Sequence, residues 1–178
     1  PFDPSRGKQY EAGVKYVPKD MPVVVTAAVY QLTKDKNLTA DPANQAFSIQ
    51  TGEIRSRGLE LEAKAAVNAN INLTAAYSYT DAEYTHDTVF NGKRPAEVPR
   101  NMASLWADYT FHETALSGLT IGAGARYIGS TVSYYKTDTS TGNKNDSFSV
   151  AGYALMDATV KYDLARFGLP GSSVGVNV

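Results

Sequence analysis

The feature that most limits what this chain can fold into is a sustained alternation of apolar and polar residues with a period of two. From Ile71 to Thr80, the odd positions hold Ile, Leu, Ala and Tyr, while the even positions are mostly Asn, Thr and Ser. From Leu59 to Val67, Leu, Ala and Val alternate with Glu and Lys in the same way. Successive side chains of a β-strand point to opposite faces, so each run predicts a strand with one apolar and one polar face.

About eight such runs follow one another, and several are long for a soluble sheet. They cover approximately residues 8–17, 23–34, 52–67, 71–83, 101–110, 119–131, 152–164 and, as a short final run, 172–178. A tilted strand needs about 9–11 residues to cross a bilayer, and most of these runs reach that length. The run at 23–34 alternates poorly, which leaves its facing open.

The segments between the runs also alternate, in length. The short ones are 18–22, 68–70, 111–118 and 165–171, and the long ones are 35–51, 84–100 and 132–151. Short turns on one side and long polar loops on the other are typical of an outer-membrane barrel, and a soluble β-sandwich has no need to sort its connections in this way. The sequence therefore predicts an all-β fold, an antiparallel transmembrane β-barrel segment whose long loops face outward from the cell.

Composition is compatible with this class and argues against several others. The chain has no Cys and two His, which excludes disulfides and leaves too few imidazoles to suggest a His-based metal site. Its 17 Lys and Arg against 18 Asp and Glu give no basic surplus for nucleic acid. No run of about 18 apolar residues predicts a transmembrane helix. The mean hydropathy of −0.30 is that of a soluble protein, but a membrane barrel is apolar only outside and averages similarly.

Tyrosine is abundant, with 12 copies, and several lie near the ends of the predicted strands. These are Tyr10, Tyr16, Tyr77, Tyr79, Tyr109 and Tyr127. Such residues form the interfacial girdles of membrane barrels, with the ring at the acyl boundary and the hydroxyl group in water. The alternative is ordinary aromatic pairing in a soluble sheet.

Five segments, in order along the chain, resemble strand signatures of the TonB-dependent outer-membrane receptors. They are GKQYEAGVKY at 7–16, GEIRSRGLELE at 52–62, YSYTDA at 77–82, VPRNMASLW at 98–106 and YALMDA at 153–158. The resemblance runs nearly end to end and is strongest toward the receptors for ferric hydroxamates, those for ferrichrome and ferrioxamine.

This resemblance implies a protein larger than the chain itself. Family members are barrels of roughly 22 strands with an N-terminal plug in the lumen, and they bind a ferric siderophore on the outer side. The periplasmic protein TonB then pulls on an N-terminal segment of the plug to drive import. The resemblance implies that residues 1–178 are the C-terminal part of the barrel, with the plug, the earlier strands and the closing strand absent.

The same resemblance implies a location and a set of partners. The location is the outer membrane of a Gram-negative bacterium, where lipid and lipopolysaccharide surround the barrel. The cargo is iron carried as a ferric siderophore, and no intrinsic cofactor is implied. TonB is a partner only through the N-terminal region that this chain lacks.

Loop aromatics are the candidate siderophore contacts. In the family, the bound iron complex is cupped largely by aromatic side chains, and this suggests Tyr134, Tyr135 and Phe90 on the basis of position alone. Apolar rings and hydroxyl donors suit a neutral hydroxamate chelate. The alternative is that these rings pack one loop against another.

Charged residues form two further candidate sets. One set, on the predicted polar faces, either contacts the plug or lines a hydrated lumen that balances its own charges. Its members are Glu11, Lys15, Glu60, Glu62, Lys64 and Arg126. The other set, Arg55 and Arg57 near the outer rim, either contacts lipopolysaccharide phosphates, which Arg binds in a bidentate manner, or forms local salt bridges.

No catalytic pattern is present, because GxSxG, HExxH and P-loop motifs are all missing. His86 lies beside Asp81, Glu83 and Asp87 but is expected to be solvated rather than to bind metal. Gly122 and its neighbours in the same predicted strand are expected to relieve crowding. Besides a siderophore receptor, three alternatives stay open: a small eight-stranded structural barrel, a passive porin segment and a soluble β-sandwich. An enzyme is the least supported class.

The alternation predicts opposite responses at two adjacent residues. Leu73→Arg should abolish assembly, since an Arg on the lipid-facing side at mid-depth costs about 2–4 kcal/mol. Thr74 points to the opposite face, so Thr74→Arg should be tolerated. Heat-modifiable migration of the intact outer-membrane protein on gels reports assembly. If Arg were tolerated equally at positions 73 and 74, the assignment of the Leu73 face to lipid would be wrong.

Overall fold

The computed structural model describes residues 2–41, 43–44, 46–88, 90–113, 115–137 and 144–178, with the backbone alone for 40, 133–137 and 144–147. These residues form ten strands and one short 3-10 helix. The strands are β1 (Arg6–Tyr16), β2 (Val23–Ala40), β3 (Ser48–Ala66), β4 (Ile71–His86), β5 (Asn101–Thr110), β6 (Leu119–Ile128), β7 (Thr131–Thr137), β8 (Lys144–Val150), β9 (Tyr153–Asp163) and β10 (Ser173–Asn177), and the helix is η1 (Leu164–Phe167). No helix among the described residues is long and apolar enough to cross a membrane.

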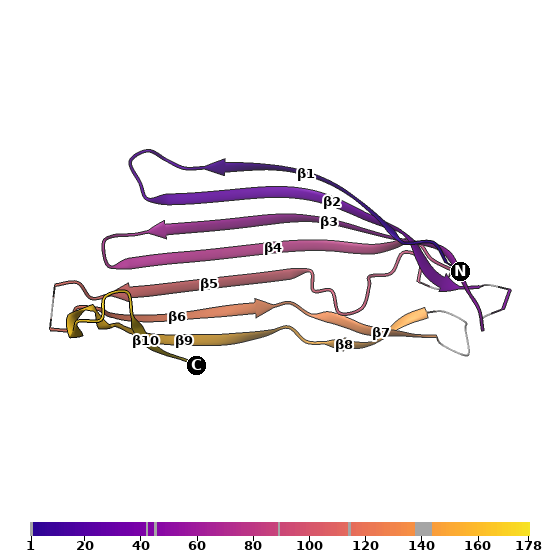
Figure 1. The fold of residues 1–178 in the computed structure, drawn as a ribbon. Coiled ribbons are helices and arrows are strands. Elements are labelled where there is room, and N and C mark those ends of the chain that lie inside the picture. The colour runs from indigo at the N-terminus through magenta and orange to yellow at the C-terminus, as the bar shows by residue number, and fades with distance from the viewer. Residues whose placement is uncertain (1, 42, 45, 89, 114, 138–143) are drawn as a thin grey trace.

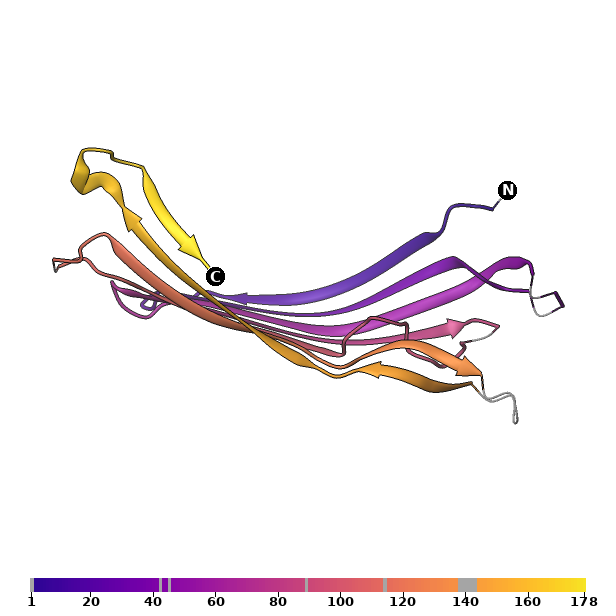
Figure 2. The same ribbon diagram turned by 90° about the horizontal axis from the view of Figure 1, so that it is seen from below.

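Eight strands form a single antiparallel sheet in the order β1-β2-β3-β4-β5-β6-β9-β10. Figure 1 shows them side by side, with the short turns at one end and the longer connections at the other. Seen from below, the sheet bends into an open trough whose two edges are β1 and β10 (Figure 2). The eight strands therefore make a curved wall and do not close into a small barrel of their own.

The register places the apolar sides of neighbouring strands on one continuous face. Tyr16 of β1 pairs with Val25, Val25 with Ala63, Ala63 with Ala75 and Ala75 with Leu105. Cross-strand partners project to the same side of a sheet, so these residues share a face. The pairing also resolves the facing of the 23–34 run, whose odd-numbered residues join the apolar face.

The apolar face is not covered by any other part of the described chain. Leu105 is 52% exposed and Val176 is 66% exposed, although both lie within strands. Only Ala82 and Val132 are buried hydrophobic residues among those described. A sheet that exposes one complete apolar face has no internal core, so it requires an apolar environment outside the chain.

The strand predictions are confirmed for the main sheet but are wrong at its outer end. Long loops were expected at 35–51 and 132–151, yet β2 continues to Ala40, β3 begins at Ser48, and 131–150 folds into the hairpin β7–β8. These segments contain apolar residues such as Leu38, Val132 and Phe148, but the residues do not alternate with polar ones over a sustained run. Their sequence therefore lacks the alternation by which a half-apolar strand is recognised.

The hairpin β7–β8 is a separate two-stranded sheet (Figure 1). Ile128 pairs with Tyr153 in the main sheet, and Thr131 pairs with Val150 in the hairpin. Both strands are thus interrupted for two residues at the same level, at 129–130 and 151–152. The hairpin continues the direction of β6 and β9 but not their ladder.

Two aromatic rings on the polar face lie over glycines of the neighbouring strand. A Cβ at Gly124 would be 2.5 Å from Trp106 Cε3, and one at Gly122 would be 2.7 Å from Trp106 Cζ2. A Cβ at Gly58 would be 2.5 Å from the ring of Tyr30, whose hydroxyl group lies 3.0 Å from Thr80 Oγ1. These glycines leave room for the rings, which agrees with the expectation that strand glycines relieve crowding.

We expect Gly124→Ala to destabilise the folded protein by about 1–3 kcal/mol, as overpacking typically does. The added Cβ would lie 2.6 Å from the backbone oxygen of Leu105, which cannot move without distorting the strand. Gly7→Ala is the matched control, because its Cβ meets nothing within 4 Å. Thermal unfolding of the detergent-solubilised intact protein measures both variants. If the Gly124→Ala protein were as stable as the control, the neighbouring Trp106 ring would have to shift without cost, and the expected overpacking would be wrong.

Candidate binding surfaces

The polar face of the sheet carries a hollow of about 580 Å³. Polar side chains from six strands line it, namely Glu11, Thr26, Glu60, Glu62, Ser78, Ser104 and Arg126. Small side chains from the same face, including Ala28 and Ala76, form its floor. The structure thus brings together most of the charged residues that the sequence assigned to the polar faces.

Several charges around this hollow are balanced within the chain. Arg126 donates from Nε and a terminal nitrogen to the two carboxylate oxygens of Asp157, both at 3.0 Å. Lys64 lies 2.7 Å from Glu62 on the same strand. Glu60, in contrast, has no ion pair among the residues that the structure describes. The charges of the polar face are therefore only partly balanced within the chain, because Glu11 and Lys15 also form no ion pair with the residues that the structure describes.

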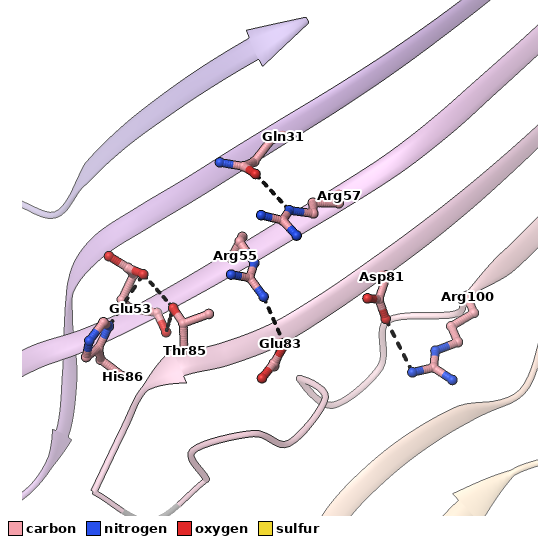
Figure 3. Close-up of polar contacts among 9 residues, drawn as sticks. All are labelled: Gln31, Glu53, Arg55, Arg57, Asp81, Glu83, Thr85, His86 and Arg100. Atoms are coloured by element: carbon pink, nitrogen blue, oxygen red, sulfur yellow. Dashed lines mark hydrogen bonds and ion pairs between the residues drawn. The ribbon is translucent and has the colours of Figure 1, made fainter.

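A second polar cluster lies on the outer extensions of β2, β3 and β4, past the apolar face (Figure 3). Arg55 pairs with Glu83 at 3.2 Å, and Arg57 Nε donates to Gln31 Oε1 at 2.7 Å. Arg100, from the loop before β5, pairs with Asp81 at 3.3 Å. The predicted rim salt bridges are confirmed for Arg55, whereas Arg57 contacts a neutral amide.

His86 belongs to the far end of this cluster. Its Nδ1 lies 3.5 Å from Glu53 Oε1, and Thr85 donates its hydroxyl group to the same carboxylate oxygen at 2.5 Å (Figure 3). The side chain of His86 is 72% exposed, which agrees with the expectation that it is solvated. Among the described residues, no group of His, Cys, Asp and Glu is arranged to hold a metal ion.

The proposed siderophore contacts are only partly described. Phe90 is half-buried and its ring centroid lies 5.8 Å from that of Tyr84. Tyr134 and Tyr135 lie in β7, but their side chains are outside the described part of the structure. The backbone nevertheless connects the two segments, because Glu97 N donates to Val132 O at 2.7 Å. The loop that carries Phe90 and the hairpin that carries the two tyrosines are therefore neighbours.

The first residues of the chain contribute a contact that the sequence did not suggest. Lys36 Nζ donates to Asp3 Oδ2 at 2.6 Å, which holds the pKa of that carboxyl group below its usual value. Gln50 also bonds to the backbone of Asp3. The three residues lie far apart in sequence, and only the pairing of β2 with β3 brings Lys36 and Gln50 together.

Comparison with known proteins gives the family of this wall-like sheet. The TonB-dependent receptor-like β-barrel family matches the chain over residues 1–178. The chain belongs to this family. TonB-dependent receptors are outer-membrane proteins of Gram-negative bacteria, and they are transporters without an intrinsic cofactor rather than enzymes. The predicted family, location and non-enzymatic class are therefore confirmed.

Curated relatives of this receptor chain are much longer than it is. It is 57% identical over 177 residues to the ferrichrome outer membrane transporter/phage receptor of Escherichia coli K12, which covers 99% of this chain and 22% of that protein. It is 37% identical over 178 residues to the ferrioxamine B receptor of Salmonella typhimurium LT2, covering 99% of this chain and 24% of the relative. The chain thus spans about a quarter of the length of these relatives.

Solved structures of outer-membrane receptors have a similar fold. The pyoverdine outer membrane receptor of Pseudomonas aeruginosa, bound to pyoverdine, superposes with a TM-score of 0.74 over 99% of this chain and 25% of that structure, at 22% sequence identity. At this identity the similarity concerns the fold alone. It confirms the all-β antiparallel architecture and identifies the sheet as part of a barrel wall, which removes the β-sandwich alternative.

Proposed function

We propose that residues 1–178 are the C-terminal part of the barrel of a receptor that binds and imports ferric hydroxamate siderophores, with energy supplied through TonB. The observation that carries this proposal is the 57% identity to a ferrichrome transporter over nearly the whole chain. The identity of 37% to a ferrioxamine B receptor supports the same hydroxamate class. The plug, the earlier strands and the TonB contact belong to the rest of that receptor.

In this proposal each face of the sheet has its own role. The exposed apolar face contacts the lipid hydrocarbon, where an uncovered row of Leu, Val and Ile costs nothing. The polar face lines the lumen and contacts the plug, with Glu60 as one of the carboxylates that form no ion pair with the described part of the chain. No bond of the siderophore is made or broken by the chain.

The outer loops provide the siderophore contacts. Phe90 on the β4–β5 loop and Tyr134 and Tyr135 on β7 belong to two segments that are joined by the hydrogen bond from Glu97 to Val132. Aromatic side chains on adjacent loops provide apolar surface and hydroxyl donors for a neutral chelate. These three residues are therefore the proposed siderophore wall of the chain.

Replacing Tyr134, Tyr135 or Phe90 by Ala should weaken ferrichrome or ferrioxamine B binding by about tenfold, since a buried aromatic contact contributes on the order of 1–2 kcal/mol. Phe167→Ala is the control, because Phe167 is a 70% exposed aromatic in η1, beside the short β5–β6 turn. Fluorescence titration of the intact purified receptor with each ferric siderophore gives the affinities. Unchanged affinity in all three variants would show that these residues do not form the siderophore site. If the unmodified receptor bound no ferric hydroxamate, the proposed function itself would be overturned.

Lipopolysaccharide is the proposed partner of the outer polar cluster. Arg57 uses Nε for Gln31, and no interaction of its two terminal nitrogens is seen with the residues that the structure describes. It projects from the same face as the apolar residues, one row beyond Leu59, where the lipid head groups begin. A guanidinium group with two adjacent donors matches a phosphate oxygen pair.

The Arg57→Gln receptor should retain less lipopolysaccharide on purification than the unmodified protein, because it loses a charged phosphate contact. Arg126→Gln is the matched control, since Arg126 lies on the polar face that the membrane does not reach. Quantifying bound lipopolysaccharide per receptor by mass spectrometry compares the two. An equal loss in both variants would indicate general destabilisation and would contradict a specific contact at Arg57.

A further inference from the structure

A polar pocket lies at the outer end of the sheet, where β3 begins and β4 ends. It has a volume of about 480 Å³, and every described side chain that lines it is polar. The lining consists of Thr51, Thr85, His86, Asp87, Thr88 and Asn91. Such a lining suits a ligand that presents hydrogen-bonding groups on several sides.

The pocket opens on the face of the wall that points away from the lumen. Thr51 and Glu53 occupy alternate positions of β3, so both project to the same side. The same alternation leads to Arg57 and then to Leu59 of the apolar face. His86 pairs with Glu53 and contacts its carboxylate, so His86 lies on this side as well (Figure 3). The occupant of the pocket therefore lies outside the barrel.

Hydrogen bonds to residues beyond the lining hold parts of the pocket in place. Asp87 Oδ1 accepts from Phe90 N at 2.7 Å. Thr88 Oγ1 lies 2.8 Å from Thr39 Oγ1, and Thr88 N donates to the same hydroxyl oxygen at 3.2 Å. The fold thus positions the lining before any ligand arrives, which lowers the entropic cost of binding.

The groups that the pocket offers favour a neutral ligand. The hydroxyl group of Thr51 and the amide of Asn91 form no hydrogen bond with the described residues, and each can both donate and accept. Asp87 in the lining and Glu53 beside it bring negative charge, which opposes an anion such as phosphate. Nor do the residues that the structure describes include a group arranged to hold a metal ion. Hydroxyl groups are the remaining match.

We propose that this outer pocket binds a neutral saccharide through neighbouring hydroxyl groups. A hydroxyl group donates one hydrogen bond and accepts others, and a sugar ring repeats this pattern at adjacent carbons. Asp87 accepts from one sugar hydroxyl group, while Thr51 and Asn91 bond to its neighbours. The inference deepens the proposed contact with lipopolysaccharide, and rests on it for the source of the sugar, because that contact concerns phosphates alone.

The level of the pocket above the membrane indicates the source of the saccharide. Glu53 lies four positions beyond Arg57 on β3, and a strand rises about 3.3 Å per residue, so the pocket lies about 13 Å farther along the strand. Arg57 is at the proposed level of the lipid phosphates, and the sugar chain of lipopolysaccharide extends outward from them. A free saccharide has the same hydroxyl chemistry, so the experiment must separate the two sources.

Saturation-transfer NMR on the intact purified receptor tests the pocket. The probe is the core oligosaccharide of lipopolysaccharide, released from its lipid by mild acid. The receptor is taken from cells whose lipopolysaccharide lacks these sugars and is kept in a detergent without a sugar head group, so that no other saccharide competes. We expect saturation of the sugar ring protons, and we expect it to persist after the phosphate groups of the probe are removed.

Two variants remove a lining group while nearly keeping the size of the side chain. Thr51→Val deletes a hydroxyl group and Asn91→Leu deletes an amide. Each should weaken oligosaccharide binding about fivefold, as expected for the loss of one hydrogen bond. Ser56→Ala is the matched control, because it removes a hydroxyl group from the opposite face of β3. Siderophore affinity should stay unchanged in all three variants.

A second preparation separates the two sources. In receptor taken from cells with complete lipopolysaccharide, the anchored sugars should occupy the pocket and reduce the saturation of added oligosaccharide. Unreduced saturation would assign the pocket to free saccharides instead.

The proposal is overturned if the oligosaccharide shows no saturation, or if its binding disappears once the phosphate groups are removed. It is also overturned if Thr51→Val and Asn91→Leu bind as tightly as Ser56→Ala. The Arg57→Gln receptor should bind the free oligosaccharide normally, so a failure of the pocket is distinguishable from a failure of the phosphate contact. Siderophore titration of the same preparations tests the proposed transport function separately.

Discussion

The structure depends on the requirement that a backbone in hydrocarbon must satisfy its own hydrogen bonds. No water is available there, so each N–H and C=O group needs a partner in a neighbouring strand. Strands β2 to β6 of the main sheet meet this requirement through antiparallel ladders with a neighbour on each side. The ladder satisfies the backbone and the surrounding lipid provides the apolar environment that a protein core otherwise provides. Residues such as Leu105 and Val160 can therefore stay exposed on the surface of the chain.

The same requirement explains which parts of the fold could be predicted from the sequence. Where one face meets lipid and the other meets water, alternation is strict, and β1 and β4 were predictable from it. β2 was only partly predictable, because Val23, Val24 and Val25 are apolar on both sides, and the register with β3 was needed to orient them. In the outer segments 35–40 and 131–150, apolar residues occur without a sustained alternation, and the pattern that marks a strand disappears.

The binding surfaces were predictable as regions but not as contacts. The sequence pointed to charged residues on the polar face and to Arg55 and Arg57 at the rim. It did not indicate that Arg55 pairs with Glu83 on the following strand while Arg57 turns to Gln31 on the preceding one. Such choices depend on a stagger between strands that is set by the whole sheet. The contacts of Arg166 with the carbonyl oxygens of Ala115 and Ser117 were missed for the same reason, because two turns distant in sequence supply them.

The double interruption beside Gly129 and Gly152 has a consequence for how such receptors can diverge. In a continuous ladder, inserting one residue would turn every later side chain to the opposite face. Here both strands lose their pairing at the same level, so the hairpin β7–β8 is not coupled to the register of β6 and β9. A register shift caused by an insertion or deletion in the hairpin therefore does not extend past this gap into β6 and β9. The hairpin β7–β8 is therefore free to vary in length, while the residues of β6 and β9 keep facing the same sides of the sheet.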